Sequence, residues 1–338
     1  MKTKLKFIFI IIDIILIIII FFFWKSKYLN NQNFKFNQRK NIYLDKYEEN
    51  IYNNIKSDLL NSKCSRMWGN QQPFINGVIR KFRPKKILEL GVAEGGSSII
   101  ILNAIKDINN SHLYSIDLST NELIGFCVKN IFTNLSKNWN LYTGNVAAKF
   151  LEEIGNGIDM ALIDSSHYEP GEILDFLIVL PFLKEEAVVI FHDIANQITR
   201  SMHSRLEWAP YIIFNIIRGK KYLPSGNNIL THDIGAVKLE RNQYKYVNDY
   251  FRALGGQWQY FPDENHIKII EKFFQKYYNN ECLIMFNETV EFNREFVKNN
   301  PIKKPPRYVY TNGSTKYFLN RRKRSKRKIK KKLFKINY

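Results

Sequence analysis

Lys86-Ile-Leu-Glu-Leu-Gly-Val-Ala-Glu-Gly-Gly-Ser-Ser98 is the stretch of sequence that decides the fold. An apolar strand leads into a turn with three glycines, and two serines then open an apolar helix that reaches Ile105. Glycines let a backbone pass close to a ligand, and the first N–H groups of a helix have no partner within it. A second short strand ends in Asp117, where an acid suits the two hydroxyls of a ribose. The sequence therefore predicts a site for a nucleoside-bearing cofactor.

Strands and helices alternate along the chain after this turn. Strands are expected at 112–117, 141–143, 158–164 and 187–193, separated by helices at 121–134, 145–154 and 172–183. This alternation is typical of a parallel sheet with helices on both faces, whose ligands lie at the carboxyl ends of the strands. Because each of them ends a strand, Asp117, Asp164, His192 and Asp193 are expected at the same edge as the glycine turn.

The regions around this core are less regular. Two helices are expected before it, at 47–60 and 72–82. Residues 195–230 are irregular and rich in aromatic and basic side chains, which makes them candidates for covering a substrate. A late strand at 234–240 is expected as the antiparallel edge of the sheet. Residues 245–300 are expected to be helical, either completing the sheet layers or forming a cap.

The composition is sufficient for a packed core, with 45% hydrophobic and 14% aromatic residues among 338. The three cysteines, Cys64, Cys127 and Cys282, show no metal-ligand spacing. An odd, scattered set argues against a disulfide framework and fits a reducing compartment.

Most of the net charge of +20 lies at the two ends of the chain. Residues 321–335 hold eleven Lys or Arg and no acid, and residues 1–27 add a net +4, so only +5 remains for the rest. The basic tail has three readings: a solvated run, a contact with anionic lipid headgroups, or a nucleic-acid contact. Nucleic acid is the least favoured partner, because the core is mildly basic and lacks an aromatic-basic stacking motif.

Phe7–Trp24 is an apolar run of eighteen residues that only Asp13 interrupts. As a helix it would span about 27 Å, which is enough for the core of a bilayer. A cleaved signal peptide is the rival interpretation, but the sequence that follows lacks the small residues of a cleavage site. The sequence therefore predicts a single-pass membrane anchor, and the basic residues after it favour a C-terminal domain in the cytoplasm.

Four motifs together resemble those of class I S-adenosylmethionine-dependent methyltransferases: Glu89-Leu-Gly-Val-Ala-Glu-Gly-Gly-Ser97, Ile116-Asp117, Ile163-Asp-Ser-Ser-His-Tyr-Glu169 and Val189-Ile-Phe-His-Asp193. The resemblance covers about residues 70–240 and is strongest to the metal-dependent O-methyltransferase branch, with its catechol-type, macrolide-sugar and cephalosporin-biosynthesis enzymes. The spacing of Gly91 and Gly95 fits this family better than the dinucleotide turn of nicotinamide enzymes.

The resemblance implies a set of residues for the methyl donor. The turn from Gly91 to Gly95 would hold the amino-acid end of S-adenosylmethionine, and Asp117 would bind its ribose hydroxyls. Asn145 would approach the adenine, and Glu89 would support the turn from below.

The resemblance also implies a divalent metal and a base. Asp164 and Asp193 match the metal ligands of the branch, and His192 stands where an acid or another polar residue is usual. Oxygen ligands favour magnesium, whereas an imidazole moves the preference toward manganese or iron. Asp164 and His167 are the catalytic candidates, His167 as the base for the acceptor hydroxyl. Both histidines also have a purely structural reading, and Asp233 is read as a turn cap.

The expected fold is α/β, with a doubly wound, mostly parallel sheet of the Rossmann-like methyltransferase type. The expected activity is O-methylation of a hydroxyl on a sugar, a glycan precursor or another small metabolite. A metal-dependent hydroxylase on the same fold and a non-catalytic protein that binds membranes or nucleic acid are the alternatives. The expected parts are a transmembrane anchor at 1–27, a linker with a first helix at 28–60, a methyltransferase domain at 61–240, a helical extension at 241–318 and a disordered polybasic tail at 319–338.

Overall fold

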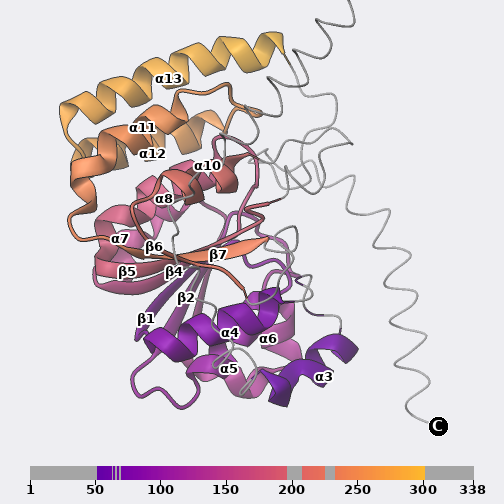
Figure 1. The fold of residues 1–338 in the computed structure, drawn as a ribbon. Helices are drawn as coiled ribbons and strands as arrows, with labels where there is room; N and C mark the ends of the chain where they lie inside the picture. Colours follow the sequence, from indigo (N-terminus) through magenta and orange to yellow (C-terminus); the bar gives the residue numbers. More distant parts are fainter. Residues whose placement is uncertain are drawn as a thin grey trace, which may run out of the picture. The chain divides into compact units, whose positions relative to one another are not determined.

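The computed structural model describes residues 52–62, 64, 67, 70–195, 208–224 and 233–300. All of them belong to one compact unit (Figure 1). The predicted anchor at 1–27, the linker up to residue 51 and the predicted basic tail at 319–338 lie outside the described residues.

Seven strands of the described part form one sheet in the order β3-β2-β1-β4-β5-β7-β6. Strands β1 to β5 are parallel, and β7 runs antiparallel between β5 and β6. The predicted doubly wound, mostly parallel sheet is therefore confirmed. The bounds are β1 Lys86–Leu90, β2 His112–Asp117, β3 Trp139–Thr143, β4 Ile158–Ile163, β5 Leu183–His192, β6 Gly219–Tyr222 and β7 Ile234–Leu239.

Strands β1, β4 and β5 form the centre of the sheet. Their sequences are near-continuous apolar runs, and almost every residue of Ile87–Leu90 and Met160–Ile163 is buried. Such runs are typical of parallel strands that are covered on both faces. The carboxyl ends of these central strands are thus fixed by the core on either side of the sheet.

Helices cover both faces of the sheet (Figure 1). On one face lie α3 Asn53–Ser62, α4 Gln71–Phe82, α5 Gly96–Ile105 and α6 Phe126–Asn130, and on the other lie α7 Leu151–Ile154, α8 Gly171–Val179 and α10 Ala209–Ile216. Short 3-10 helices complete the connections: η1 Thr133–Asn138, η2 Ala147–Lys149, η3 Leu180–Phe182 and η5 Gln243–Tyr246.

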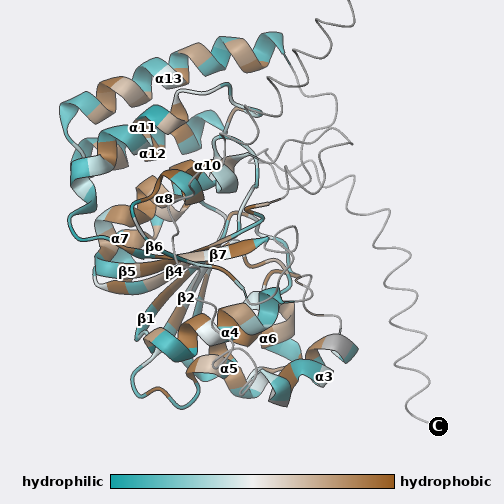
Figure 2. Ribbon diagram, in the orientation of Figure 1, coloured by the Kyte–Doolittle hydropathy of each residue, from teal (hydrophilic) through white to brown (hydrophobic). Residues whose placement is uncertain are grey.

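The C-terminal extension forms a further helical layer outside α8 (Figure 1). Its helices are α11 Val247–Leu254, α12 Glu264–Tyr277 and α13 Asn280–Asn299, and it adds no strand to the sheet among the described residues. Edge-to-face contacts among aromatic rings join these helices: the buried Phe274 of α12 contacts Phe251 of α11 and Phe286 of α13, and also the partly buried Tyr278. Figure 2 shows apolar residues alternating with hydrophilic ones along α13, where Ile284 and Phe292 are exposed.

Several predicted elements differ from the structure. The helix expected at 121–134 is reduced to α6 and η1, because Gly125 adopts a positive φ of 67° that an α-helix does not accommodate. The helix expected at 145–154 becomes η2 and α7. The stretch expected to be irregular contains α10 and β6, so β6 is the edge strand and β7 lies inside the sheet.

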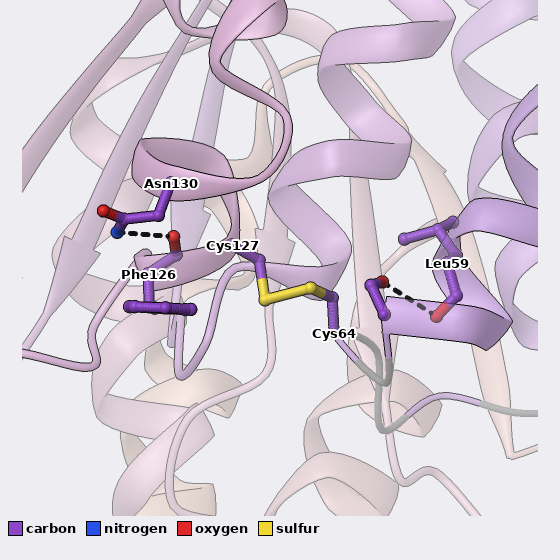
Figure 3. The surroundings of a disulfide bond; sticks show 6 residues. Leu59, Cys64, Phe126, Cys127 and Asn130 are labelled. Atoms are coloured by element: carbon purple, nitrogen blue, oxygen red, sulfur yellow. Dashed lines mark hydrogen bonds between the residues drawn. A yellow bond between two sulfur atoms is a disulfide. The ribbon is translucent and has the colours of Figure 1, made fainter. Parts of the chain in front are cut away.

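A disulfide joins Cys64 to Cys127, which corrects the argument against a disulfide framework (Figure 3). The two residues are 63 positions apart, and the fold brings the segment before α4 against α6. Cys282 is buried and free. The pairing depends on the fold, which brings the segment before α4 beside α6. It cannot be deduced from the spacing of the cysteines.

None of the helices in the described ranges is long and apolar enough to cross a membrane. This finding corrects the predicted localisation, a single-pass membrane protein with a cytoplasmic catalytic domain. The run Phe7–Trp24, which motivated that prediction, lies outside the described residues.

Reduction of the disulfide is expected to lower the free energy of unfolding by about 2–4 kcal/mol, because the bond closes a long loop in the unfolded chain. Urea unfolding of the full chain with and without reductant measures this effect. A Cys64→Ser/Cys127→Ser variant is the control, since its midpoint should not respond to reductant. An unchanged midpoint of the wild-type chain in reductant would contradict the pairing.

Candidate functional site

The glycine turn between β1 and α5 is shaped by its contact with the end of β4. Gly91 has a φ of 86°, and a Cβ placed on it would lie 1.9 Å from the carbonyl oxygen of Asp164. No side chain fits there, so glycine is required whether or not a ligand approaches. The backbone N–H of Asp164 also donates to the carbonyl of Leu90 at 2.9 Å. The turn and the end of β4 are therefore one rigid edge.

Glu89 is fully buried beneath this turn. Its carboxylate accepts hydrogen bonds from the hydroxyls of Ser97 at 2.5 Å, Ser98 at 2.6 Å and Ser115 at 2.6 Å. Ser115 in turn accepts from the indole N–H of Trp139 at 2.8 Å. Burial raises the pKa of Glu89 to about 7 although the three hydroxyls oppose that shift. The carboxylate thus ties β1 to β2 and to the first turn of α5.

Asp117 ends β2 and holds the backbone of the glycine turn. One carboxylate oxygen accepts the N–H groups of Val92 at 3.0 Å and Ala93 at 3.1 Å, and the other accepts the N–H of Ser119 at 2.8 Å. Burial raises the pKa of this carboxyl above its ordinary value. Its predicted contact with a ribose stays a prediction.

Asn145 follows β3 at the same edge of the sheet. Its side-chain oxygen accepts the backbone N–H of Val146 at 2.9 Å. The preceding Gly144 donates its N–H to the carbonyl of Asp117 at 3.0 Å, which brings the two loops together. The predicted approach of Asn145 to an adenine also stays a prediction.

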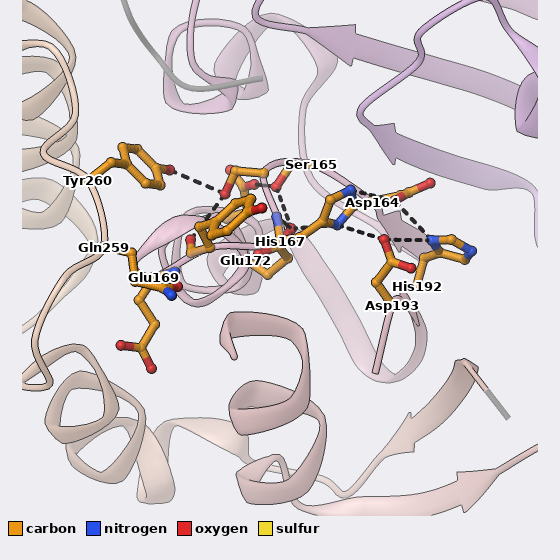
Figure 4. A network of polar contacts seen from close by, with 12 residues as sticks. Asp164, Ser165, His167, Glu169, Glu172, His192, Asp193, Gln259 and Tyr260 are labelled. Carbon is orange, nitrogen blue, oxygen red and sulfur yellow. Dashed lines mark hydrogen bonds and ion pairs between the residues drawn. The ribbon is translucent and has the colours of Figure 1, made fainter. Parts of the chain in front are cut away.

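Two acids and two histidines converge where β4 and β5 end (Figure 4). Nδ1 of His192 lies 3.2 Å from Asp164 Oδ1 and 3.4 Å from Asp193 Oδ2. Nδ1 of His167 lies 3.1 Å from Asp193 Oδ2, and its Nε2 lies 3.9 Å from Asp164 Oδ1. The structure therefore brings together all four residues predicted for the metal and the base.

The donor atoms of this cluster are arranged as a cation would require. One ligand atom each from Asp164, His167 and Asp193 lies within 4.8 Å of the others. Among the described residues, Nδ1 of His167 and both ring nitrogens of His192 are buried without a hydrogen bond of good geometry. Buried polar atoms of this kind are costly unless a partner satisfies them, so the residues present fit a metal ion.

The electrostatics of the cluster follow from its burial and its mixed charges. Burial alone would lower the pKa of His167 and His192, but the neighbouring carboxylates outweigh it, and both values are raised above normal. Burial would raise the pKa of Asp193, but the two imidazoles hold it far below its ordinary range. The carboxylates that stabilise protonated imidazoles are also the donors that a metal cation would use.

Four further acidic or hydroxyl side chains belong to the site; three were missed from the sequence, and the fourth, Asp233, was read as a turn cap. Glu172 accepts the backbone N–H of His167 at 2.5 Å, and Ser165 donates its hydroxyl to Asp175 at 2.5 Å. Asp233 accepts the N–H of Ala195 at 2.8 Å, and its pKa is raised to about 7 by burial and by Asp193. The two acids of α8 stand in an otherwise apolar helix, Gly171–Val179, which was the available signal.

Comparison with known proteins identifies the class. Residues 88–194 match the family model described as a methyltransferase domain. The match runs from β1 to the end of β5 and includes the glycine turn and the cluster of acids and histidines. This part of the chain is similar to a methyltransferase domain, and the predicted class of S-adenosylmethionine-dependent methyltransferases is confirmed.

Solved structures with a similar fold include three methyltransferases. An O-methyltransferase from Bacillus cereus, in complex with SAH, has 16% identity and a TM-score of 0.44, covering 56% of this chain and 90% of its own. A putative caffeoyl-CoA O-methyltransferase from Staphylococcus aureus has 21% identity and a TM-score of 0.42, with coverage of 64% and 99%. MycE from the mycinamycin biosynthetic pathway has 16% identity and a TM-score of 0.39, with coverage of 57% and 55%. A comparison with curated proteins found no match.

Replacing Glu89 by Gln is expected to flatten the pH dependence of stability between about pH 4.5 and 7. The pKa of Glu89 is raised from 4.5 to about 7 in the folded state. The stability linked to this group is therefore complete below the unfolded pKa and is lost as the pH rises through the folded one. In urea unfolding, the loss of stability between about pH 5 and pH 8 should be smaller in the variant than in the wild type by up to about 3 kcal/mol.

Glu288→Gln, a substitution at an exposed position of α13, is the matched control. It should keep the pH dependence of the wild type. Equal pH dependence in Glu89→Gln and in the wild type would contradict the assigned role of burial.

Proposed function

We propose that this protein transfers the methyl group of S-adenosylmethionine to a hydroxyl oxygen of a small acceptor, with the help of a divalent cation. One observation carries the proposal: the glycine turn and the cluster of acids and histidines lie on one sheet edge, joined where Gly91 packs on the backbone of Asp164. A site for a nucleoside-bearing donor thus borders a site for a cation.

The residues of the turn suit the donor, which supplies the methyl group from its sulfonium. The first turn of α5 has backbone N–H groups without a partner in the helix and no side-chain cap, and such groups bind a carboxylate well. Asp117 already accepts three backbone N–H groups. A carboxylate has about four acceptor positions, so Asp117 keeps room for a ribose hydroxyl.

The cluster suits a divalent cation, which lowers the pKa of a bound hydroxyl and fixes its direction. Asp164, His167 and Asp193 would hold it, because their donor atoms converge. This assignment differs from the prediction from sequence, which gave the ligand place to His192 and the role of base to His167. Two carboxylates with an imidazole fit manganese or iron as well as magnesium.

His192 is the proton acceptor in this proposal. Its Nδ1 faces the carboxylates of Asp164 and Asp193, which fixes the orientation of the ring. Its Nε2 is the other ring nitrogen and makes no hydrogen bond to the described residues. A histidine held by carboxylates through one nitrogen can take a proton at the other.

The acceptor class rests on the chemistry of the cluster and on the resemblance of the sequence. A cation held by carboxylates binds and activates an oxygen nucleophile, which supports a hydroxyl acceptor. A sugar, a glycan precursor or another small hydroxylated metabolite is the acceptor that the resemblance supports.

A second candidate function is a metal-dependent hydroxylation on the same fold. The observation in its favour is the presence of two imidazoles beside the carboxylates, a donor set that suits non-haem iron. Consumption of oxygen by the iron-loaded chain would support it, whereas S-adenosylmethionine turnover with manganese or magnesium would support methyl transfer.

The full chain is expected to bind S-adenosylmethionine in isothermal titration calorimetry. Asp117→Asn should weaken the binding at least about tenfold, because it removes the charged acceptor at the ribose position. Asp249→Asn, at an exposed ion pair with Arg252, is the control and should leave the affinity unchanged. A folded wild-type chain that binds no S-adenosylmethionine would exclude the proposed function.

The roles of the two histidines can be separated by titrating Mn²⁺ alone into the full chain. Asp164→Asn, Asp193→Asn and His167→Asn are each expected to weaken binding at least about tenfold, because each removes a ligand. His192→Asn should keep most of the Mn²⁺ affinity and lose methyl transfer. Loss of Mn²⁺ binding in His192→Asn, with binding retained in His167→Asn, would restore the assignment made from the sequence.

A further inference from the structure

The loop that carries Asp164 and His167 contacts the C-terminal extension. This loop, residues 164–170, connects β4 to α8, and the contacting residues lie between α11 and α12. Gln259 pairs with Glu169 twice: its side-chain oxygen accepts the Glu169 N–H, and its own N–H donates to the Glu169 carbonyl, both at 3.0 Å. The extension therefore holds the backbone of the loop at two points.

Tyr260 makes the second contact (Figure 4). Its hydroxyl donates to Ser166 Oγ at 3.2 Å, and both side chains are buried. The Ser166 hydroxyl donates in turn to the Tyr168 carbonyl at 3.2 Å. It also fills the space beside Gly171, where a Cβ would lie 1.7 Å from it. Gly171 thus leaves room for the Ser166 hydroxyl, and the Tyr260 hydroxyl donates to it in that position.

His167 sits between these contacts in an unfavourable backbone conformation. Its φ is 65°, in the left-handed region that costs a non-glycine residue about 1 kcal/mol or more. Such a conformation persists only where the surroundings fix it. Glu172 fixes it from the inner side by accepting the His167 N–H. The flanking residues Ser166 and Glu169 are fixed from the outer side by the extension.

The contacting residues are themselves anchored in the helical layer. The backbone N–H of Trp258 donates to the side-chain oxygen of Asn293 on α13 at 2.7 Å, and its indole N–H donates to the Leu254 carbonyl at 2.8 Å. Trp258 and Asn293 are both buried. These hydrogen bonds therefore attach the segment 258–260 to α11 and α13.

We propose that Gln259 and Tyr260 are positioning residues that hold His167 in the conformation that aims its ring at Asp164 and Asp193. The role of this ring in a reaction rests on the proposed function. The positioning of the ring rests on the contacts alone. Residues 259 and 260 lie outside the part of the chain that matches the methyltransferase family. The extension would then be part of the site.

The experiment uses the full chain labelled with ¹³C at the histidine Cε1 position. The NMR signal of His167 is assigned by its loss in His167→Asn. In Tyr260→Phe and in Gln259→Ala the His167 signal should shift or split, because the loop gains a second conformation. In the double variant, which combines Tyr260→Phe with Gln259→Ala, the affinity for Mn²⁺ should fall about tenfold. Residues that hold a metal ligand in place usually contribute this much to affinity. Affinity for S-adenosylmethionine should stay within about twofold of the wild type.

Tyr278→Phe is the matched control. Tyr278 is a tyrosine of the same extension whose hydroxyl donates to the Leu177 carbonyl at 2.5 Å, and that contact is away from the loop. The control should lose a similar amount of thermal stability and leave the His167 signal in place. If the double variant does not fold, Tyr260→Phe decides, since it removes a single hydroxyl.

An unchanged His167 signal in a folded Tyr260→Phe or double variant would overturn the positioning role. A wild-type chain that binds neither Mn²⁺ nor S-adenosylmethionine would instead remove the proposed function. The NMR comparison would still decide the positioning in that case, so the two failures are distinguishable.

Discussion

The close contact between the carboxyl ends of the neighbouring strands β1 and β4 is the constraint on which the site depends. The chain leaves β1 through Gly91, which lies against the Asp164 carbonyl so closely that no side chain fits between them. The hydrogen bond from the Asp164 N–H to Leu90 holds the same two strand ends. The glycine turn and the first acid of the cluster therefore have one fixed separation. Any change that parts these strands would disturb both at once.

A buried cluster of opposite charges then forms at this edge, and its presence is better explained by function than by stability. Burying charged groups is costly, and even a well-paired buried cluster often stabilises a fold less than apolar residues would. Here Asp164 and Asp193, which follow β4 and β5, and Glu172 of α8 lie around two partly buried histidines. The same arrangement shifts pKa values strongly in both directions, which is common at catalytic and metal sites.

The sequence was sufficient for the features that depend on local pattern. The central strands are short apolar runs, and Asp117, Asp164 and Asp193 follow such runs, so the topology of a parallel sheet placed them together. The pairing of Cys64 with Cys127 depends on the folded arrangement of two distant segments, which the spacing of the cysteines does not indicate. Strand β6 is four residues long and half polar, too short for a periodic signal. The contact of Tyr260 with Ser166 spans 94 positions and follows only from the packed helical layer.

The two flanks of the matched domain show why its boundaries are not the boundaries of the site. Before it, the disulfide attaches the chain to α6, and Cys127 of that helix donates its N–H to the Glu94 carbonyl in the glycine turn. After it, the extension reaches the loop between β4 and α8 through Gln259. The shared fold sets the edge where chemistry can occur, because parallel strands end there. The flanking segments then restrict the two loops that the sheet alone leaves free.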